Sequence, residues 1–405
     1  MVILGHSGSM PRIVSLLINI VAVGAWLALI GYLLVRSELF GWDFHIYQQA
    51  GQAFLAHKDP LDDPYLVHVG KTRAYLPFVY PPLAVFPFLA FASLSKASAF
   101  YIWVALEAVG LAWLIKVWKR SFVDFSISGK WAIALLLLFN GTVYSCFATG
   151  NFALFEALSL FLAMEALLRK NDEKCAGLLV FAACFKVLPI FYLGLLPFLG
   201  GKNRIRATVY GIFAFGLYLA LNLALYPRPT MEFVQVAMTR SDNRNNNPSL
   251  LAFFEDLSSR APVMGGREMY LIAVAGIIAT SILAIRRWKD PDPAVRLLFI
   301  LLVISFVLPR FMIYSYIQLI PAGWLALREV RGLARWATLA LLCAVLPGSF
   351  LLMSRPLWSA ALEQALGMQI GVWGYASLYG AIAIWGIFLA KIIKPPSREM
   401  TPTGG

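Results

Sequence analysis

The chain has few charged side chains for its length. Of its 405 residues only 14% are charged, whereas 60% are hydrophobic. A water-soluble chain carries about 25% charged residues, because its surface must be hydrated. The shortage of charge excludes an ordinary soluble protein and indicates that most of the surface faces an apolar medium.

Histidine and cysteine are also scarce, with four residues of each. The cysteines lie in or beside apolar segments and have no metal-site spacing, which is typical of small packing residues. A short aspartate-rich segment has two interpretations, because such segments bind hard cations but Asp-Pro pairs are also ordinary turns. These aspartates are Asp59, Asp62 and Asp63. We expect no metal site and no cofactor.

Long, continuous apolar runs are the main feature of the sequence. Runs of about 17–25 residues fit helices that cross a bilayer, and the absence of alternating polarity argues against a β-barrel. The sequence therefore predicts an all-α integral membrane protein, a single transmembrane domain over residues 1–405 with about 11–13 helical spans. The predicted apolar segments are 12–35, 81–94, 97–117, 131–147, 152–168, 175–198, 205–226, 268–285, 293–308, 312–327, 336–352 and 370–393.

The net charge of +13 could indicate a nucleic-acid partner, but its distribution does not. Lysine and arginine form short clusters between apolar runs, which is the pattern of cytoplasmic loops. We therefore expect no nucleic acid and a multi-pass protein of the inner (plasma) membrane. This orientation places two long polar segments, 36–80 and 227–266, on the non-cytoplasmic face, each with an interfacial helix. The tail, 394–405, is expected to be a frayed cytoplasmic segment.

The number of passes between 81 and 200 has two solutions. Strict alternation of the runs places two basic clusters, 116–120 and 169–174, outside the cytoplasm, against the charge rule. A re-entrant 81–94, with 175–198 broken into two short passes, satisfies the rule instead. The sequence leaves both arrangements open.

The first polar segment (36–80) contains an amphipathic pattern that begins near Trp42. Apolar residues recur there at helical spacing, which predicts a helix lying on the membrane interface. Asp43 stands at its start. Asp43 could be a helix N-cap, or it could be a general base at the bilayer surface, where partial burial raises the proton affinity of a carboxylate.

Polar residues within or beside the apolar runs are the other candidates for function, since charge inside a bilayer is costly. Lys186 could reach the membrane surface from a helix break before Pro189, or it could meet a phosphate. Glu156 is either a buried acid or the partner of a basic residue. The segment 309–316 is either an aromatic belt with an arginine or part of a site. The asparagine-rich 240–250 forms a loop or matches the hydroxyls of a sugar.

Taken in order, these pieces resemble glycosyltransferase family 87 of the GT-C superfamily, which includes polyprenyl-phosphate-mannose-dependent mannosyltransferases. The resemblance covers about residues 12–327 and depends on the order of several weak motifs. They are Asp43-Phe44 with Tyr47 and Ala50, Asp59-Pro60, Tyr80-Pro81-Pro82-Leu83, Gly150-Asn151, the surroundings of Lys186, Asn247-Pro248-Ser249-Leu250, and Pro309 to Tyr316 with Pro321-Ala322.

The resemblance implies an inverting enzyme of the non-cytoplasmic face. Asp43 would be the catalytic base that activates an acceptor hydroxyl, and Lys186 and Arg310 would bind the phosphate of a polyprenyl-phosphate sugar. The acceptor would be a lipid or a glycan, and membrane lipids would surround the chain. The residues expected to contact substrate are His45, Tyr47, Tyr80, Asn151, Glu156, Asn247, Tyr314 and Tyr316.

Two other functions remain as alternatives from the sequence. One is a transporter or flippase of lipid-linked saccharides, although the chain has no evident internal repeat. The other is a non-catalytic assembly subunit of an envelope-glycan enzyme. Loss of transfer on substitution of Asp43 would distinguish an enzyme from both.

Overall fold

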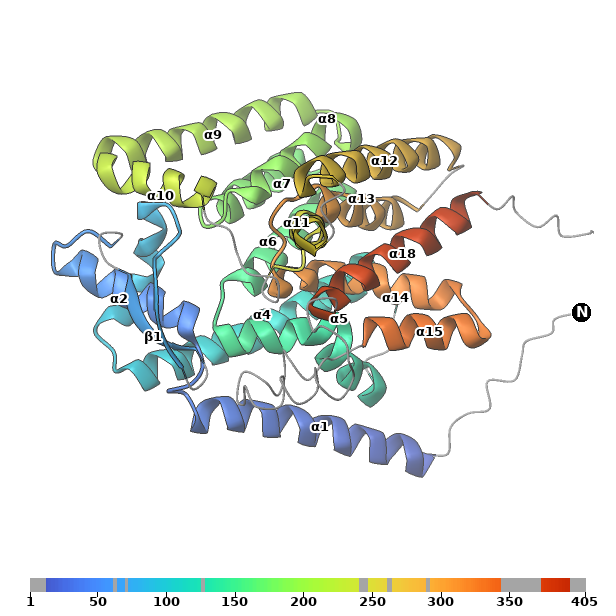
Figure 1. Ribbon diagram of the computed structural model, residues 1–405, viewed down its shortest axis with the longest axis horizontal. Helices are drawn as coiled ribbons and strands as arrows, with labels where there is room; N and C mark the ends of the chain where they lie inside the picture. The colour runs from blue at the N-terminus through green and yellow to red at the C-terminus, as the bar shows by residue number, and fades with distance from the viewer. Residues whose placement is uncertain are drawn as a thin grey trace, which may run out of the picture.

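The computed structural model describes residues 12–60, 64–69, 72–124, 128–239, 247–260, 264–288, 292–343 and 373–393. Asp62, Asp63, most of the asparagine-rich stretch and the tail 394–405 lie outside these residues. The long helices run roughly side by side, and α2, β1 and α10 lie together at one end of the molecule, on the left of Figure 1.

The first half of the chain contains most of the long helices and a β-hairpin, with short 3₁₀ helices written η. Its elements are α1 (Arg12–Val35), α2 (Trp42–Leu55), β1 (Tyr65–Val69), β2 (Thr72–Leu76), η1 (Pro82–Phe88), α3 (Leu89–Ala92), α4 (Lys96–Ser121), α5 (Gly129–Thr149), α6 (Ala153–Leu168), α7 (Asp172–Ala183), η2 (Leu188–Leu195) and α8 (Leu196–Leu199).

The second half contains two further long helices, α9 and α12, and several shorter ones. Its elements are α9 (Arg204–Leu225), α10 (Pro227–Thr239), α11 (Leu250–Arg260), α12 (Gly266–Arg287), α13 (Pro293–Val307), η3 (Ile313–Leu319), α14 (Ile320–Glu329), α15 (Gly332–Leu342), η4 (Trp373–Tyr375) and α18 (Ala376–Ile393).

The predicted fold class, an all-α polytopic membrane protein, is confirmed. In the described part of the chain, five helices are long and apolar enough to cross a membrane: α1, α4, α5, α9 and α12. Only 6% of the apolar window of α1 is buried inside the protein, so almost all of this helix is available to lipid. Five further apolar segments are shorter, and a total of 11–13 spans stays a prediction.

Segment 81–94 does not form a spanning helix. It folds into η1 and α3, which together cover 11 residues (82–92), whereas a crossing needs about 20. The glutamines of α2 fasten this segment to the first polar segment. Gln48 Nε2 donates to the carbonyls of Phe91 and Leu94 at 3.0 Å, and Gln52 Nε2 donates to the carbonyl of Ala92 at 3.0 Å.

Segment 175–198 is broken, and its two halves form a hairpin. The chain leaves α7 at Cys184 and turns before η2. Lys170 Nζ donates to the carbonyl of Leu199 at 2.8 Å, and the Gly201 amide donates to Asp172 Oδ1 at 2.7 Å. The start of α7 and the end of α8 therefore lie side by side. The short 81–94 and the broken 175–198 are the two features that the second sequence-based arrangement requires, and the number of passes between 81 and 200 stays a prediction.

Basic clusters meet at one end of the bundle as a result. Arg120, at the end of α4, and Arg169, after α6, both pair with Glu165, the latter at 2.8 Å. Arg328 Nη1, in the last turn of α14, donates to the carbonyl of Asp124 at 3.0 Å. Membrane proteins collect their basic residues on one side of the membrane, and this arrangement of the cations agrees with that rule.

The first polar segment has two features that differ from the sequence-based expectation. It contains an antiparallel β-hairpin in which Tyr65 pairs with Leu76 and Val69 with Thr72. The predicted helix is present as α2, but its apolar side packs on protein: Phe44, Tyr47 and Ala50 are at most 1% exposed. Phe44 stacks on Trp103 of α4 with ring centroids 4.9 Å apart.

Candidate active site

Two glycines allow the start of α2 to touch the end of α5. Gly41 and Gly150 both have positive φ, 69° and 64°, which side chains rarely permit. A Cβ on Gly150 would lie 2.7 Å from Cβ of Phe44 and 3.4 Å from Cα of Gly41. The Gly41 amide donates to the carbonyl of Ala148 at 2.8 Å. This close backbone contact fixes the residues that follow each glycine, Asp43 and Asn151, next to each other.

Asp43 lies in the first turn of α2 and is partly exposed. The N-cap of the helix is Gly41, which makes no side-chain cap bond. Asp43 instead accepts a hydrogen bond from Asn151 Nδ2, with 2.7 Å between Nδ2 and Oδ2. The N-cap interpretation therefore does not describe Asp43, whose carboxylate is directed to a contact between two distant parts of the chain.

The orientation of the Asn151 amide follows from its other bonds. Its Oδ1 accepts the Ala153 backbone N–H at 3.0 Å, at the start of α6, and its own N–H donates to Thr149 Oγ1 at 3.1 Å. With Oδ1 so engaged, Nδ2 must point the other way. There it reaches Asp43 and, at 3.5 Å, the hydroxyl of Tyr80.

Two tyrosine hydroxyls extend this contact. Tyr47, one turn after Asp43, and Tyr80, after β2, have hydroxyl oxygens 2.7 Å apart. Burial raises the pKa of Tyr47 well above 10, and burial also raises the pKa of Tyr80, although the nearby Lys186 ammonium opposes that rise. Both phenols thus stay protonated at neutral pH and are available as hydrogen-bond donors.

Lys186 supplies a cation to the same region. It stands at the turn of the α7–η2 hairpin, and its Nζ lies 2.8 Å from Glu156 Oε2, in the first turn of α6. Both side chains are largely buried, with 17% and 7% exposed. The ammonium also lies 4.7 Å from the ring centroid of Tyr314, a cation–π distance. A buried, charge-paired lysine therefore faces the tyrosine-rich side of the site.

The segment 309–316 is held against the second polar segment (227–266). Asn247 Oδ1 accepts the Phe311 N–H at 2.8 Å, and the Tyr316 hydroxyl donates to the carbonyl of Pro248 at 2.6 Å. Asn247 and Tyr316 are thus engaged in holding this segment, whereas Tyr314 reaches Lys186. Arg310 is half-buried in the same segment, beside the anchored Phe311.

The structure gathers most, though not all, of the residues selected from the sequence. We call the gathered set the Asp43 cluster: Asp43, Tyr47, Tyr80, Asn151, Glu156, Lys186 and Tyr314. His45 lies on the other side of α2, because two residues advance a helix by more than half a turn. The roles assigned to all of these residues stay predictions.

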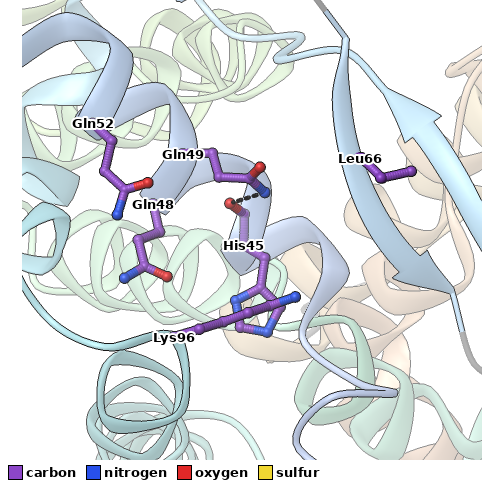
Figure 2. A pocket seen from close by; sticks show the side chains of 6 residues that line it. All are labelled: His45, Gln48, Gln49, Gln52, Leu66 and Lys96. Atoms are coloured by element: carbon purple, nitrogen blue, oxygen red, sulfur yellow. Dashed lines mark hydrogen bonds between the residues drawn. The ribbon is translucent and has the colours of Figure 1, made fainter. Parts of the chain in front are cut away.

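A second polar site was missed in the sequence. A cavity of about 250 Å³ is lined by His45, Gln48, Gln49, Gln52, Leu66 and Lys96 (Figure 2). The available signal was a run of glutamines on one face of an otherwise apolar helix. Among the described residues, no group of three or more His, Cys, Asp or Glu side chains is placed to hold a metal ion.

Comparison with protein families gives one match. The model of glycosyltransferase family 87 matches residues 78–315, more than half of the chain. The matched region includes Tyr80, Asn151 and Lys186, whereas Asp43 and Tyr47 precede it. Comparison with curated proteins finds no match. The family match and the apolar helices together show that this chain is a membrane glycosyltransferase belonging to family 87.

Proposed function

We propose that this glycosyltransferase moves a sugar from a polyprenyl-phosphate donor to a hydroxyl of a lipid or glycan acceptor. The observation that carries the proposal is the Asp43 cluster, in which a carboxylate lies near a buried lysine. The hydroxyl nucleophile requires a base to accept its proton, and the phosphate leaving group requires a cation to stabilise its negative charge. Mannose or another hexose or pentose is the proposed sugar.

The proposed reaction is a single displacement with inversion. Asp43 accepts the proton of the acceptor hydroxyl as its oxygen bonds to the anomeric carbon. The bond from that carbon to the donor phosphate breaks, and the electron pair leaves with the polyprenyl phosphate. The product is an inverted glycoside. Asn151 holds the carboxylate in a fixed orientation, so that the base need not reorganise.

Lys186 is proposed to bind the leaving phosphate. An ammonium group has three donors, so it can keep its bond to Glu156 and still donate to a phosphate oxygen. Charge-assisted hydrogen bonds to an oxyanion are stronger than neutral ones, and they strengthen as charge develops on the leaving group. Arg310 is the second proposed phosphate ligand, and the hydroxyls of Tyr80 and Tyr314 are proposed sugar contacts.

The setting in the membrane supports a lipid-linked donor. The Asp43 cluster lies at the end of the bundle opposite the Glu165 ion pairs, because α4 begins beside α2 and carries Arg120 in its last turn. With basic clusters in the cytoplasm, the cluster faces the exterior or periplasm of an inner-membrane protein. A hydrocarbon tail can then lie along the apolar helices, and no cofactor is proposed.

Asp43→Asn tests the proposal most directly. This variant keeps an acceptor for the Asn151 amide but removes the base, so we expect transfer to fall by about 10²–10⁴-fold. Protein yield, unfolding temperature and binding of polyprenyl-phosphate sugar should be unchanged. Transfer is measured with purified protein, a radiolabelled donor lipid and a membrane acceptor extract.

Glu38→Gln is the matched control, since Glu38 is an exposed carboxylate of the same polar segment that pairs only loosely with Arg36, at 3.8 Å. It should transfer at the wild-type rate. Wild-type transfer by Asp43→Asn would instead reject Asp43 as the base. A deletion strain that accumulates unflipped lipid-linked saccharide would favour the transporter interpretation.

A further inference from the structure

A polar cavity lies behind the helix that carries Asp43. Its lining residues on α2 are His45, Gln48, Gln49 and Gln52, which face away from Asp43 and Tyr47. The cavity runs from buried side chains, His45 and Gln48, to exposed ones. It is therefore reached from outside, and α2 separates it from the Asp43 cluster.

Two of the three glutamines, Gln48 and Gln52, present acceptors to this space. The amide nitrogens of all three are engaged with backbone carbonyls: Gln48 and Gln52 with α3 and its end, and Gln49 with the carbonyl of His45 at 3.1 Å. Figure 2 shows the amide oxygens of Gln48 and Gln52 turned toward the side where Lys96 and His45 lie. Carbonyl oxygens gathered in this way match the O–H donors of a polyol.

His45 is the buried titratable group at this cavity, and the backbone of Ser37 and the side chain of Gln48 are its nearest hydrogen-bonding groups. The residue is 1% exposed, and neither ring nitrogen makes a hydrogen bond of ordinary geometry with the described residues. Burial, and secondarily the charge of Lys96, lower the pKa of His45 from 6.5 to about 3. The imidazole is therefore neutral and offers one donor and one acceptor. Because neither nitrogen makes a hydrogen bond of ordinary geometry, a ligand hydroxyl in the cavity would complete the bonding of the imidazole.

Lys96 adds a positive charge at the mouth of the cavity. It is exposed, and no ion pair joins it to a carboxylate among the residues that the structure describes. It is also the first residue of the membrane-spanning helix α4, which places it at the depth of lipid headgroups. The positive end of the α4 dipole favours an anion at the same place.

From these observations we propose that the cavity binds an anionic polyol, a phosphate ester with neighbouring hydroxyl groups. Lys96 contacts the anion, and His45 with the amide oxygens of Gln48 and Gln52 contacts the hydroxyls. The ligand has two possible sources that share this chemistry, the headgroup of an anionic lipid or a soluble polyol phosphate. The site stands apart from the transfer reaction and does not depend on the proposed role of Asp43.

Binding of glycerol 1-phosphate to the full-length protein in neutral nanodiscs tests the site. Saturation-transfer NMR should detect binding to the wild type, and Lys96→Gln should weaken it by about tenfold or more, since one charge-assisted contact is lost. His45→Phe, which removes both ring nitrogens, should weaken it as well. Lys58→Gln, an exposed lysine that does not line the cavity, is the matched control and should bind like the wild type.

Three further measurements decide the proposal and the source of the ligand. Asp43→Asn should keep wild-type affinity, because the cavity lies across α2, and loss of binding in this variant would assign the ligand to the Asp43 cluster instead. Equal affinity of Lys96→Gln and wild type, or no detectable binding, would overturn the proposal. Nanodiscs of phosphatidylglycerol should displace the probe if a lipid supplies the ligand, and displacement no greater than by phosphatidylcholine indicates a soluble source.

Discussion

At the scale of single residues, Asn151 controls the geometry of the proposed base. Its carbonyl oxygen accepts the backbone N–H of Ala153, the first residue of α6, and its amide nitrogen donates to Asp43. The two ends of this one amide bond to two different helices. Substitutions of Asn151 can therefore change the charge beside Asp43 and the orientation of Asp43 independently. The buried side chain, 1% exposed, leaves little room for other conformations.

Asn151→Asp should raise the pH that transfer requires. The new carboxylate still accepts the Ala153 N–H, but it places a second negative charge within hydrogen-bond distance of Asp43. Two adjacent carboxylates resist losing the second proton, so the acidic limb of the kcat/KM profile should move to higher pH by roughly one unit or more. The pH–rate profile of the purified variant checks this.

Asn151→Ala serves as the companion variant, because it removes the amide donor without adding charge. It should lose activity with a smaller shift of the acidic limb than Asn151→Asp, because a lost hydrogen bond disfavours the ionised carboxylate less than an adjacent negative charge does. An unshifted limb in Asn151→Asp would argue that the group titrating in the reaction is not Asp43.

At the scale of elements, the α7–η2 hairpin carries a cation into the bundle. A helix that continued through Lys186 would have its amide ladder interrupted by Pro189. The chain breaks and turns back there, and the turn sets Lys186 opposite Glu156 and Tyr314. The hairpin thus places a charge inside the bundle and next to its partners. In an unbroken transmembrane helix the same buried charge would be energetically costly.

Variants that remove one or both charges of the Lys186–Glu156 pair should distinguish the effect of the pair on stability from its effect on sugar transfer. Lys186→Met leaves Glu156 buried and unpaired, which should cost about 3–5 kcal/mol of stability. The double variant Lys186→Met/Glu156→Gln removes both charges and should recover most of that loss, as judged by thermal unfolding in detergent.

Neither variant should bind the donor phosphate with wild-type affinity. If the double variant is stable but does not transfer sugar, the loss of activity is not caused by unfolding. Transfer at the wild-type rate by the double variant would rule out Lys186 as a phosphate ligand.

At the scale of the whole molecule, the two ends of the bundle differ in construction. One end gathers basic clusters around Glu165 and Asp124. The other end holds α2, the β-hairpin and α10 (Figure 1). The short segment 81–94 and the α7–η2 hairpin are the elements on which we base this separation.

Cysteine labelling checks this topology. In a background without the four native cysteines, Lys58→Cys should react from one side of sealed vesicles, and Lys174→Cys and Lys202→Cys from the opposite side. All three positions are exposed. Vesicles of known orientation and a membrane-impermeant maleimide give the readout. Labelling of Lys174→Cys from the same side as Lys58→Cys would contradict the placement of 81–94 or of the hairpin.

The sequence by itself determined that the protein lies in a membrane, that it is helical, and which family it belongs to. Low charge and long apolar runs exclude a water-facing surface, and in hydrocarbon only internally hydrogen-bonded backbone is stable. The order of short motifs around Asn151, Lys186 and Asn247 predicted glycosyltransferase family 87, which the family match confirms. These properties depend on composition and order, which need no knowledge of contacts.

Only the tertiary structure decided which polar residues meet. Asp43 and Asn151 are far apart in the chain, and their contact depends on two positive-φ glycines that no helical periodicity marks. The folding of 175–198 into a hairpin likewise depended on hydrogen bonds such as that from Lys170 to the carbonyl of Leu199. His45 was grouped with Asp43 by proximity in sequence, but helix geometry placed it at another cavity, because neighbouring residues on a helix point in different directions.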